Sequence, residues 1–304
     1  MTQRRRSGFS LIELMLVLVL LSIVGGSLMS LLSKQQRFYR GTYDLIELRS
    51  QLRQAEAVMS SDLRALSTPG NDFQTITDSS MDFRYTLGSS ISCTAPAPGT
   101  KVIIIPPTAA ANGNTLTNWL TGPLQGDTAW VFDEGANATA SSDDQWQPYE
   151  IRSISLPGIG TCDAAYNAPS AGYTITMTNS LSPTILEGAA IRFVRQAHYS
   201  LYQSGNDKSW YLGYACSVCN NGNASVSPIA GPFMPYTDPG GTDISGIRIT
   251  YFDSSGTATT DKTKVARVSV VLRGQTRNAL NVSGLKQGVY MDSIRMTIAL
   301  RNRS

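Results

Sequence analysis

The chain has 304 residues, of which 41% are hydrophobic and 15% are charged. This is the composition of a folded globular protein, and it excludes a disordered chain. The 26 Gly and 14 Pro residues are scattered, which excludes a collagen-like protein. The run Arg4-Arg5-Arg6 accounts for the whole formal net charge of +3. The rest of the chain therefore has no basic excess to neutralise phosphates, and no nucleic-acid partner is expected.

The segment 9–32 follows this basic run and is apolar except for Ser, Gly and the single charged residue Glu13. As a helix it is about 36 Å long, which is enough to cross the hydrocarbon core of a bilayer. The basic flank predicts a cytoplasmic N-terminus, with the rest of the chain outside the inner membrane. An ordinary secretory signal has a shorter apolar region that is followed by a small-residue cleavage site. Segment 9–32 is longer and no Ala-x-Ala site follows it, so an ordinary secretory signal is excluded.

Glu13 is the unusual residue of this segment, because a carboxylate inside a membrane helix costs about 2.5–3.5 kcal/mol. A position near the membrane interface, or protonation, is one explanation. A second comes from the run Gly8-Phe9-Ser10-Leu11-Ile12-Glu13-Leu14, which resembles the cleavage and methylation motif of type IV prepilins and pseudopilins. The resemblance implies that residues 1–8 are a leader, that prepilin peptidase cleaves after Gly8, and that the new amine of Phe9 is methylated.

The resemblance also implies a role for Glu13 in assembly, since the glutamate of this family is the fifth residue of the mature chain. In a filament the helices 9–32 pack side by side, and we expect Glu13 of one subunit to pair with the Phe9 amine of its neighbour. This pairing fixes the axial register between subunits. The expected partners are therefore prepilin peptidase, other pilins or pseudopilins, and the inner membrane. Gly25-Gly26 permit either a kink or close packing of the helix.

Segment 33–67 keeps the helical periodicity but is more polar. Its apolar residues recur at spacings of three or four and form one stripe of an amphipathic helix. They are Leu45, Leu48, Leu52, Ala55, Met59, Leu63 and Leu66. The pattern ends at Thr68-Pro69-Gly70, so residues 9–67 are expected to form one helix about 88 Å long. Its charged residues are expected to form a solvated face; they are Arg49, Arg53, Glu56, Asp62 and Arg64.

After Asn71 the periodicity changes to two, which is typical of half-buried strands. Strands are expected at residues 81–87, 101–105, 128–133, 150–156, 173–178, 190–203, 209–214, 247–252, 265–272 and 294–300, and a hairpin turn at Ser204-Gly205-Asn206-Asp207. These elements predict a pilin-like α+β fold. A long N-terminal helix, membrane-spanning and then amphipathic, packs on a C-terminal head of antiparallel sheets at 71–304. A weaker break near 157–169 makes two subdomains an alternative to one.

Short pieces of the head resemble one subgroup of the family. They are Leu52 with Asp62-Leu63-Arg64, Gly126-Asp127, Tyr251-Phe252-Asp253 with Gly256, and Leu300-Arg301-Asn302-Arg303. These pieces are similar to minor pilins of the PilW class and to J-type minor pseudopilins of type II secretion. The first resemblance implies a structural subunit that helps to initiate or cap a type IV pilus. The second implies a subunit at the tip of a secretion pseudopilus. Both place the head outside the inner membrane.

The four cysteines are Cys93, Cys162, Cys216 and Cys219. An even number in a domain outside the inner membrane is typical of disulfides. Cys216 and Cys219 are expected to form a small local disulfide, which leaves Cys93 to pair with Cys162. Half a zinc site, a redox motif and free thiols are the alternatives for the close pair.

The sequence offers no catalytic constellation. His198 is the single histidine and is expected to be a structural strand residue, which does not favour a metal site or acid–base machinery. No Gly-x-Ser-x-Gly run and no phosphate-binding loop with Lys are present. The pairs Asp133-Glu134 and Asp143-Asp144, and the residues Asp238 and Asp243, are expected in solvated loops, with calcium binding as the alternative. We therefore expect no enzyme activity, no cofactor and no metal site.

Overall fold

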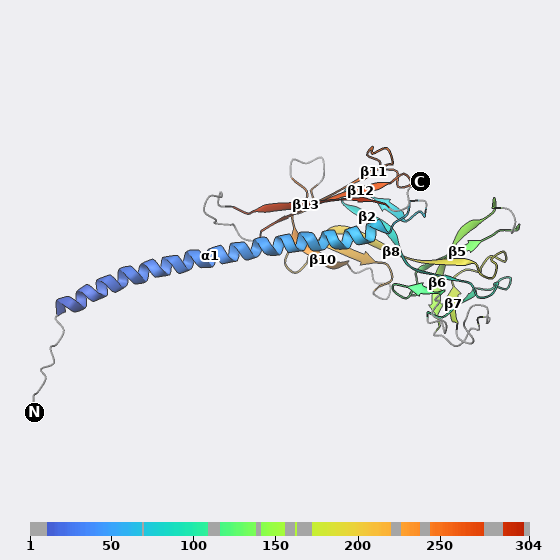
Figure 1. Ribbon diagram of the computed structural model, residues 1–304, viewed down its shortest axis with the longest axis horizontal. Coiled ribbons are helices and arrows are strands. Elements are labelled where there is room, and N and C mark those ends of the chain that lie inside the picture. The colour runs from blue at the N-terminus through green and yellow to red at the C-terminus, as the bar shows by residue number, and fades with distance from the viewer. Residues whose placement is uncertain are drawn as a thin grey trace, which may run out of the picture.

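The computed structural model describes residues 11–68, 70–108, 116–137, 141–155, 162, 172–219, 226–237, 244–276 and 288–300. In this part of the chain one long helix leads into a head of antiparallel strands (Figure 1). The first half of the helix extends away from the head, and its second half lies along it. The α+β class and the pilin-like arrangement expected from the sequence are confirmed.

Helix α1 (Leu11–Arg64) is continuous, and the pair Gly25-Gly26 does not break it. The sequence predicts a helix that continues to Ser67, whereas α1 ends a few residues earlier. At its end the N–H of Ala65 donates to the carbonyl of Asp62 at 3.2 Å. This is a three-residue turn, which tightens the last turn of a helix and often ends it.

Thirteen strands follow α1 in the described residues. They are β1 (Phe73–Ile76), β2 (Ser80–Ile91), β3 (Val102–Ile105), β4 (Asn118–Trp119), β5 (Thr128–Asp133), β6 (Gln145–Ile154), β7 (Tyr173–Met177), β8 (Ala190–Gln203), β9 (Trp210–Cys216), β10 (Val226–Phe233), β11 (Ile247–Phe252), β12 (Arg267–Gln275) and β13 (Met291–Ala299). Every strand expected from the sequence overlaps one of these. β1, β4 and β10 are additional. β10 contains Pro228 and Pro232, which argue against a central strand, and it lies at a sheet edge where a residue without an N–H is tolerated.

The described strands form two antiparallel sheets. In the larger sheet the order is β1-β2-β8-β5-β6-β7-β3, with β4 beside β2, and with β9 on β8 and β10 on β9. The smaller sheet has the order β11-β12-β13. The expected turn at Ser204 joins β8 to β9, and the N–H of Ser204 donates to the carbonyl of Ser209 at 2.9 Å.

The first hydrophobic core lies between α1 and the two sheets. From α1 it receives the predicted stripe, which is buried at Leu48, Leu52, Ala55, Met59 and Leu63 and continues at Leu66. The larger sheet contributes residues such as Phe83 and Tyr199, and the smaller sheet contributes Val268, Val270 and Leu272. Burial of this apolar surface is the dominant favourable contribution to folding.

A second core lies at the far end of the head and has no contribution from α1. Its buried residues come mainly from β3, β5, β6 and β7, and include Ile103, Val131, Ile151 and Ile175. The two longest strands, β2 and β8, supply residues to both cores. The break that the sequence suggests near 157–169 lies outside the described residues, apart from Cys162.

Gly88 in β2 allows the close approach of β4. A Cβ atom at Gly88 would collide with the carbonyl oxygen of Asn118 and lie 2.9 Å from the Cα of Trp119. We predict that Gly88→Ala lowers the free energy of unfolding by about 1–3 kcal/mol, because backbone atoms must move. Gly205→Ala is the control, since a Cβ there has no neighbour within 4 Å. Thermal unfolding checks this prediction, and equal midpoints for the two variants would contradict it.

Candidate assembly interface

The first half of α1 presents apolar side chains to its surroundings. All residues from 11 to 40 are exposed, and an 18-residue window has a mean hydropathy of 2.5. By length and composition this is a helix able to cross a membrane. The hydroxyls of Ser22 and Ser27 donate to the carbonyls of Val19 and Val24, at 2.7 and 2.8 Å. These bonds satisfy both hydroxyls within the helix, so the apolar half needs no water.

Glu13 lies in the first turn of α1, where the helix dipole favours a negative charge. Gly8 and Phe9 lie outside the described residues, so Glu13 is the one predicted functional residue of the motif that the structure places. The first buried residue of α1 is Gly41. About 28 residues, or roughly 42 Å of helix, separate it from Glu13. Among the described residues, this length of exposed helix separates Glu13 from the head.

Polar contacts hold the second half of α1 on both sheets. Arg49 forms an ion pair with Asp292 of β13 at 3.0 Å. The N–H of Gly231 in β10 donates to the side-chain oxygen of Gln51 at 3.1 Å. The first contact belongs to the smaller sheet and the second to the larger one. Together they fix the rotation of α1 about its own axis.

Asp62 was expected on the solvated face of the helix, but in the structure it is partly buried and bonded to the core. Its carboxylate accepts a hydrogen bond from the hydroxyl of Tyr199 at 2.6 Å. Tyr199 is fully buried in the first core and stacks on Phe83, with ring centroids 5.2 Å apart. Burial raises the pKa of Asp62 and outweighs the hydrogen bond from Tyr199, which lowers it. Burial and the nearby carboxylate also raise the pKa of Tyr199, so its hydroxyl stays protonated and donates.

This pair gives a pH-dependent prediction. The pKa of Asp62 is higher in the folded state than in the unfolded chain, so its contribution to stability is full below the ordinary Asp pKa of about 3.9. The contribution is lost as the pH rises through the raised value. We predict that Asp62→Asn, which keeps the acceptor, is at least as stable as the unchanged protein at pH 7, with an advantage that shrinks toward pH 4. Asp62→Ala leaves the Tyr199 hydroxyl without its acceptor and costs about 1–3 kcal/mol. Chemical unfolding from pH 4 to pH 7 tests both variants, and equal losses in both at pH 7 would refute the prediction.

Two arginines of β8 form ion pairs that the sequence analysis missed. Arg195 donates two hydrogen bonds to Asp127, at 2.9 and 2.7 Å, and both side chains are almost fully buried. Arg192 binds Asp72 at 2.9 Å, and Asp72 also accepts the N–H of Ser67 at 2.8 Å, just after α1 ends. Loss of one partner would leave an uncompensated buried charge. The sequence feature that could have indicated these ion pairs is the presence of two arginines within an otherwise apolar part of a predicted strand.

All four cysteines are in disulfides. Cys216 is joined to Cys219, with Cα atoms 5.4 Å apart, and Cys93 is joined to Cys162, with Cα atoms 5.1 Å apart. The first bridge closes a short loop after β9. The second connects residues separated by 69 positions and lies beside Ile104 of β3. It therefore ties Cys162 to β3, whose residues Ile103 and Ile105 belong to the second core.

The loop lengths give a prediction for the two bridges. In the chain-entropy account, the long loop of Cys93–Cys162 contributes about 4 kcal/mol and the short loop of Cys216–Cys219 about 2 kcal/mol. Replacing both cysteines of a bridge by Ala should therefore destabilise the head more for the first pair than for the second. Unfolding of the oxidised variants in denaturant checks the order. Alkylation of four thiols in the unreduced protein, or stoichiometric zinc, would contradict the pairing.

Of the carboxylates expected in a solvated loop at the β5–β6 hairpin, Asp144 is exposed, whereas Asp133 and Asp143 form hydrogen bonds within the hairpin. Asp133 is buried and accepts hydrogen bonds from the N–H of Gly135 at 3.0 Å and from the side chain of Gln147 at 2.8 Å. Asp143 accepts the N–H of Asn137 at 3.1 Å. These bonds fold the two ends of the hairpin loop onto each other. Asp133 is therefore a structural residue of this turn.

His198 lies in β8, and its Nδ1 is 2.6 Å from a carboxylate oxygen of Asp82 in β2. The two residues face each other across the strands, which is the structural role expected from the sequence. Within the described ranges, no group of three or more His, Cys, Asp or Glu side chains is placed to hold a metal ion. Asp238 and Asp243 lie outside those ranges.

Comparison with known proteins bears on the N-terminal half of α1. Residues 3–29 match the family model of the prokaryotic N-terminal methylation motif. No curated protein and no solved structure matches the chain. The matched residues include Gly8, Phe9 and Glu13, and proteins of the pilin-like family are structural rather than catalytic. The motif, the exposed apolar helix and the antiparallel head are together similar to those of type IV pilins and pseudopilins, and the helix is long and apolar enough to anchor the chain in a membrane.

Proposed function

We propose that the chain is a minor pilin, which helps to initiate or cap a type IV pilus after prepilin peptidase cleaves between Gly8 and Phe9. The observation that carries the proposal is the division of α1 into two halves. The half that continues the matched motif is apolar and exposed, whereas the other half packs along the head and buries one stripe of side chains in it. A helix that is apolar on all sides must be covered by lipid or by other apolar helices. The membrane covers it before assembly, and the helices of neighbouring subunits cover it afterwards.

In this proposal the N-terminus is cytoplasmic and the head is periplasmic. The basic run Arg4-Arg5-Arg6 before the apolar segment supports this orientation. The two disulfides also support it, because such bonds persist in an oxidising compartment. The size of the head supports a minor subunit, since the major pilins that the chain resembles usually carry smaller heads.

Glu13 has the assembly role in this proposal. Its isolated carboxylate costs about 2.5–3.5 kcal/mol in a membrane helix, and pairing with the Phe9 amine of a neighbour offsets that cost. The long exposed stretch of α1 between Glu13 and the head supports a role in assembly and not in folding.

The test compares Gly8→Val, Glu13→Val and the unchanged chain in the producing cell. We expect the unchanged protein in sheared filaments to begin at methylated Phe9. Gly8→Val should stay uncleaved, because a β-branched side chain replaces the residue that the peptidase accepts. Glu13→Val should be cleaved and should insert into the membrane more easily, by about 2–3 kcal/mol. It should nevertheless enter filaments poorly, with a head that resists protease as before.

Two outcomes would count against the proposal. Normal incorporation of Glu13→Val would show that the carboxylate is dispensable, and Met1 on filament-associated protein would refute the processing. Deletion of the gene separates the two kinds of filament. Loss of surface pili with intact secretion supports the minor pilin, and the reverse assigns the chain to a type II secretion pseudopilus.

A further inference from the structure

The smaller sheet turns one face to the first core and the other face outward. Val268, Val270 and Leu272 of β12 are buried in the core, and the residues of β12 that alternate with them are not fully buried. Figure 1 shows β11, β12 and β13 along one side of α1. Residues that lie opposite each other in adjacent strands point to the same face of a sheet. The register of the three strands therefore gives the layout of the outer face.

Three arginines come together on this outer face. Arg248 of β11 and Arg295 of β13 both lie opposite Val271 of β12, so their backbones are about 10 Å apart, which is two strand spacings. Arg273 follows Val271 by two residues in β12 and points to the same face. Burial lowers the pKa of Arg273, and the positive charges of Arg248 and Arg295 lower it further. The three guanidinium groups are therefore close enough to repel one another.

No carboxylate of the three strands neutralises this group of arginines. Arg248 and Arg295 are exposed and form no ion pair with another described residue. The single acidic residue of β11, β12 and β13 is Asp292, which pairs with Arg49 of α1 on the core side of the sheet. Like charges on one face repel, so an anion from outside the molecule would be attracted to it.

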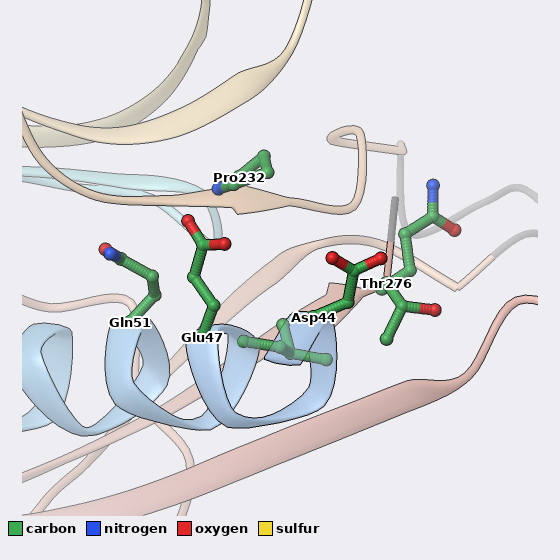
Figure 2. A pocket seen from close by; sticks show the side chains of 7 residues that line it. Asp44, Glu47, Gln51, Pro232 and Thr276 are labelled. Atoms are coloured by element: carbon green, nitrogen blue, oxygen red, sulfur yellow. The ribbon is translucent and has the colours of Figure 1, made fainter. Parts of the chain in front are cut away.

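The carboxylates of α1 beside the end of β12 also lie on the core side. Figure 2 shows Asp44 and Glu47 pointing from α1 toward Pro232 of β10, with Thr276 at the other side. The pocket that these residues line has a volume of only about 20 Å³. Because α1 packs in the first core, the smaller sheet separates these carboxylates from the arginines of its outer face.

A row of hydroxyl groups lies next to the arginines. Thr250, Ser269 and Thr297 are opposite one another on the three strands, two residues along from the arginine row. Each hydroxyl can donate and accept a hydrogen bond. The next row contains Phe252 and Arg267, and the guanidinium of Arg267 lies 4.7 Å from the centroid of the Phe252 ring. The outer face therefore presents guanidinium groups, hydroxyl groups and one aromatic ring in successive rows.

We propose that the outer face of the smaller sheet binds an acidic polysaccharide. Carboxylates of the polymer bind the guanidinium groups of Arg248, Arg273 and Arg295, since a guanidinium and a carboxylate match through two parallel hydrogen bonds. Hydroxyl groups of the sugars bind the row of Thr250 and its neighbours. Each contact is at the protein surface and is individually weak, and a polymer strengthens them by making several at once.

The density of charge favours a polysaccharide over a nucleic acid. A DNA duplex carries about six negative charges over the distance of about 10 Å that separates Arg248 from Arg295. The outer face offers few arginines for these charges, and the chain beyond the run Arg4-Arg5-Arg6 has no basic excess to add. A polymer of uronic acids carries one carboxylate on each sugar, with hydroxyl groups between them. That pattern matches a face on which arginines and hydroxyl groups alternate.

The first experiment measures binding by titration calorimetry with the full-length chain in detergent micelles. We expect polygalacturonate to bind, with an affinity that falls as the salt concentration rises. Neutral dextran should not bind, and duplex DNA should bind more weakly. Arg248→Gln/Arg295→Gln should lower the affinity for polygalacturonate about tenfold. The matched control is Arg152→Gln, because Arg152 is exposed in β6, outside the smaller sheet. Absence of binding, or an equal loss in the control, would overturn the proposal.

The second experiment tests the hydroxyl row, which a general polyanion site would not need. We expect Thr250→Val/Thr297→Val to lower the affinity for polygalacturonate several-fold and to leave that for DNA unchanged. Thr176→Val in β7 is the control, since it makes the same change on a strand of the larger sheet. An unchanged affinity for polygalacturonate in the double variant would refute the proposal, and so would tighter binding of DNA than of polygalacturonate.

Thermal unfolding separates lost binding from lost folding. Arg248→Gln/Arg295→Gln removes a repulsion, so we expect its unfolding midpoint to be at least as high as that of the unchanged chain. A lower midpoint would show that the two arginines stabilise the fold and would count against the proposal. Binding is measured on the isolated chain, so its failure leaves the minor pilin proposal intact. That proposal depends on cleavage and filament entry, which are scored in cells.

Discussion

The burial of one stripe of α1 between two sheets is the interaction on which the rest of the structure depends. The smaller sheet has its apolar face, at Val268, Val270 and Leu272, in the same core as Leu52 and Met59 of α1. Without the helix, this face and part of the larger sheet would be exposed to water. The helix and the first core are therefore one folding unit. The consequence for the membrane-proximal half is that its position is set from the head, through a continuous helix.

The two cores are joined by continuous strands and not by a linker. β2 and β8 contribute to both cores, and β8 also carries the two arginines whose ion pairs anchor the surrounding loops. Arg192 binds Asp72, which directly precedes β1, and Arg195 binds Asp127, which directly precedes β5. Asp72, Asp127 and Arg195 are buried, so each of these charges requires its partner, whereas Arg192 is partly exposed. These pairs make the orientation of the far core relative to α1 part of the folded state.

Periodicity alone predicted much of this fold. The stripe of α1 and the strands β5, β8 and β11 follow directly from spacings of three or four and of two. The sequence did not predict β10, because its prolines act against a strand until a sheet edge is available. The sequence analysis also expected Asp62 and Asp133 to be exposed to solvent. Their hydrogen-bond partners, Tyr199 for Asp62 and Gln147 for Asp133, are distant in the sequence and come close only in the folded chain. The site was predicted from a motif of a few residues. Gly8 and Phe9 lie outside the described residues, and the roles of Gly8, Phe9 and Glu13 stay predictions.

The continuity of β2 and β8 has a mechanical consequence for a molecule anchored at one end. A force applied between the anchored helix and the far core passes through this strand pair, which extends from Ser80 opposite Ser200 to Ile91 opposite Ala190 with one register shift between Thr86 and Gly88. Antiparallel strands that are pulled along their length share the load over many backbone hydrogen bonds at once, whereas strands that are peeled apart break them one by one. The head can therefore transmit tension along its length with little extension, and rupture is expected to begin in the loops and not between the cores.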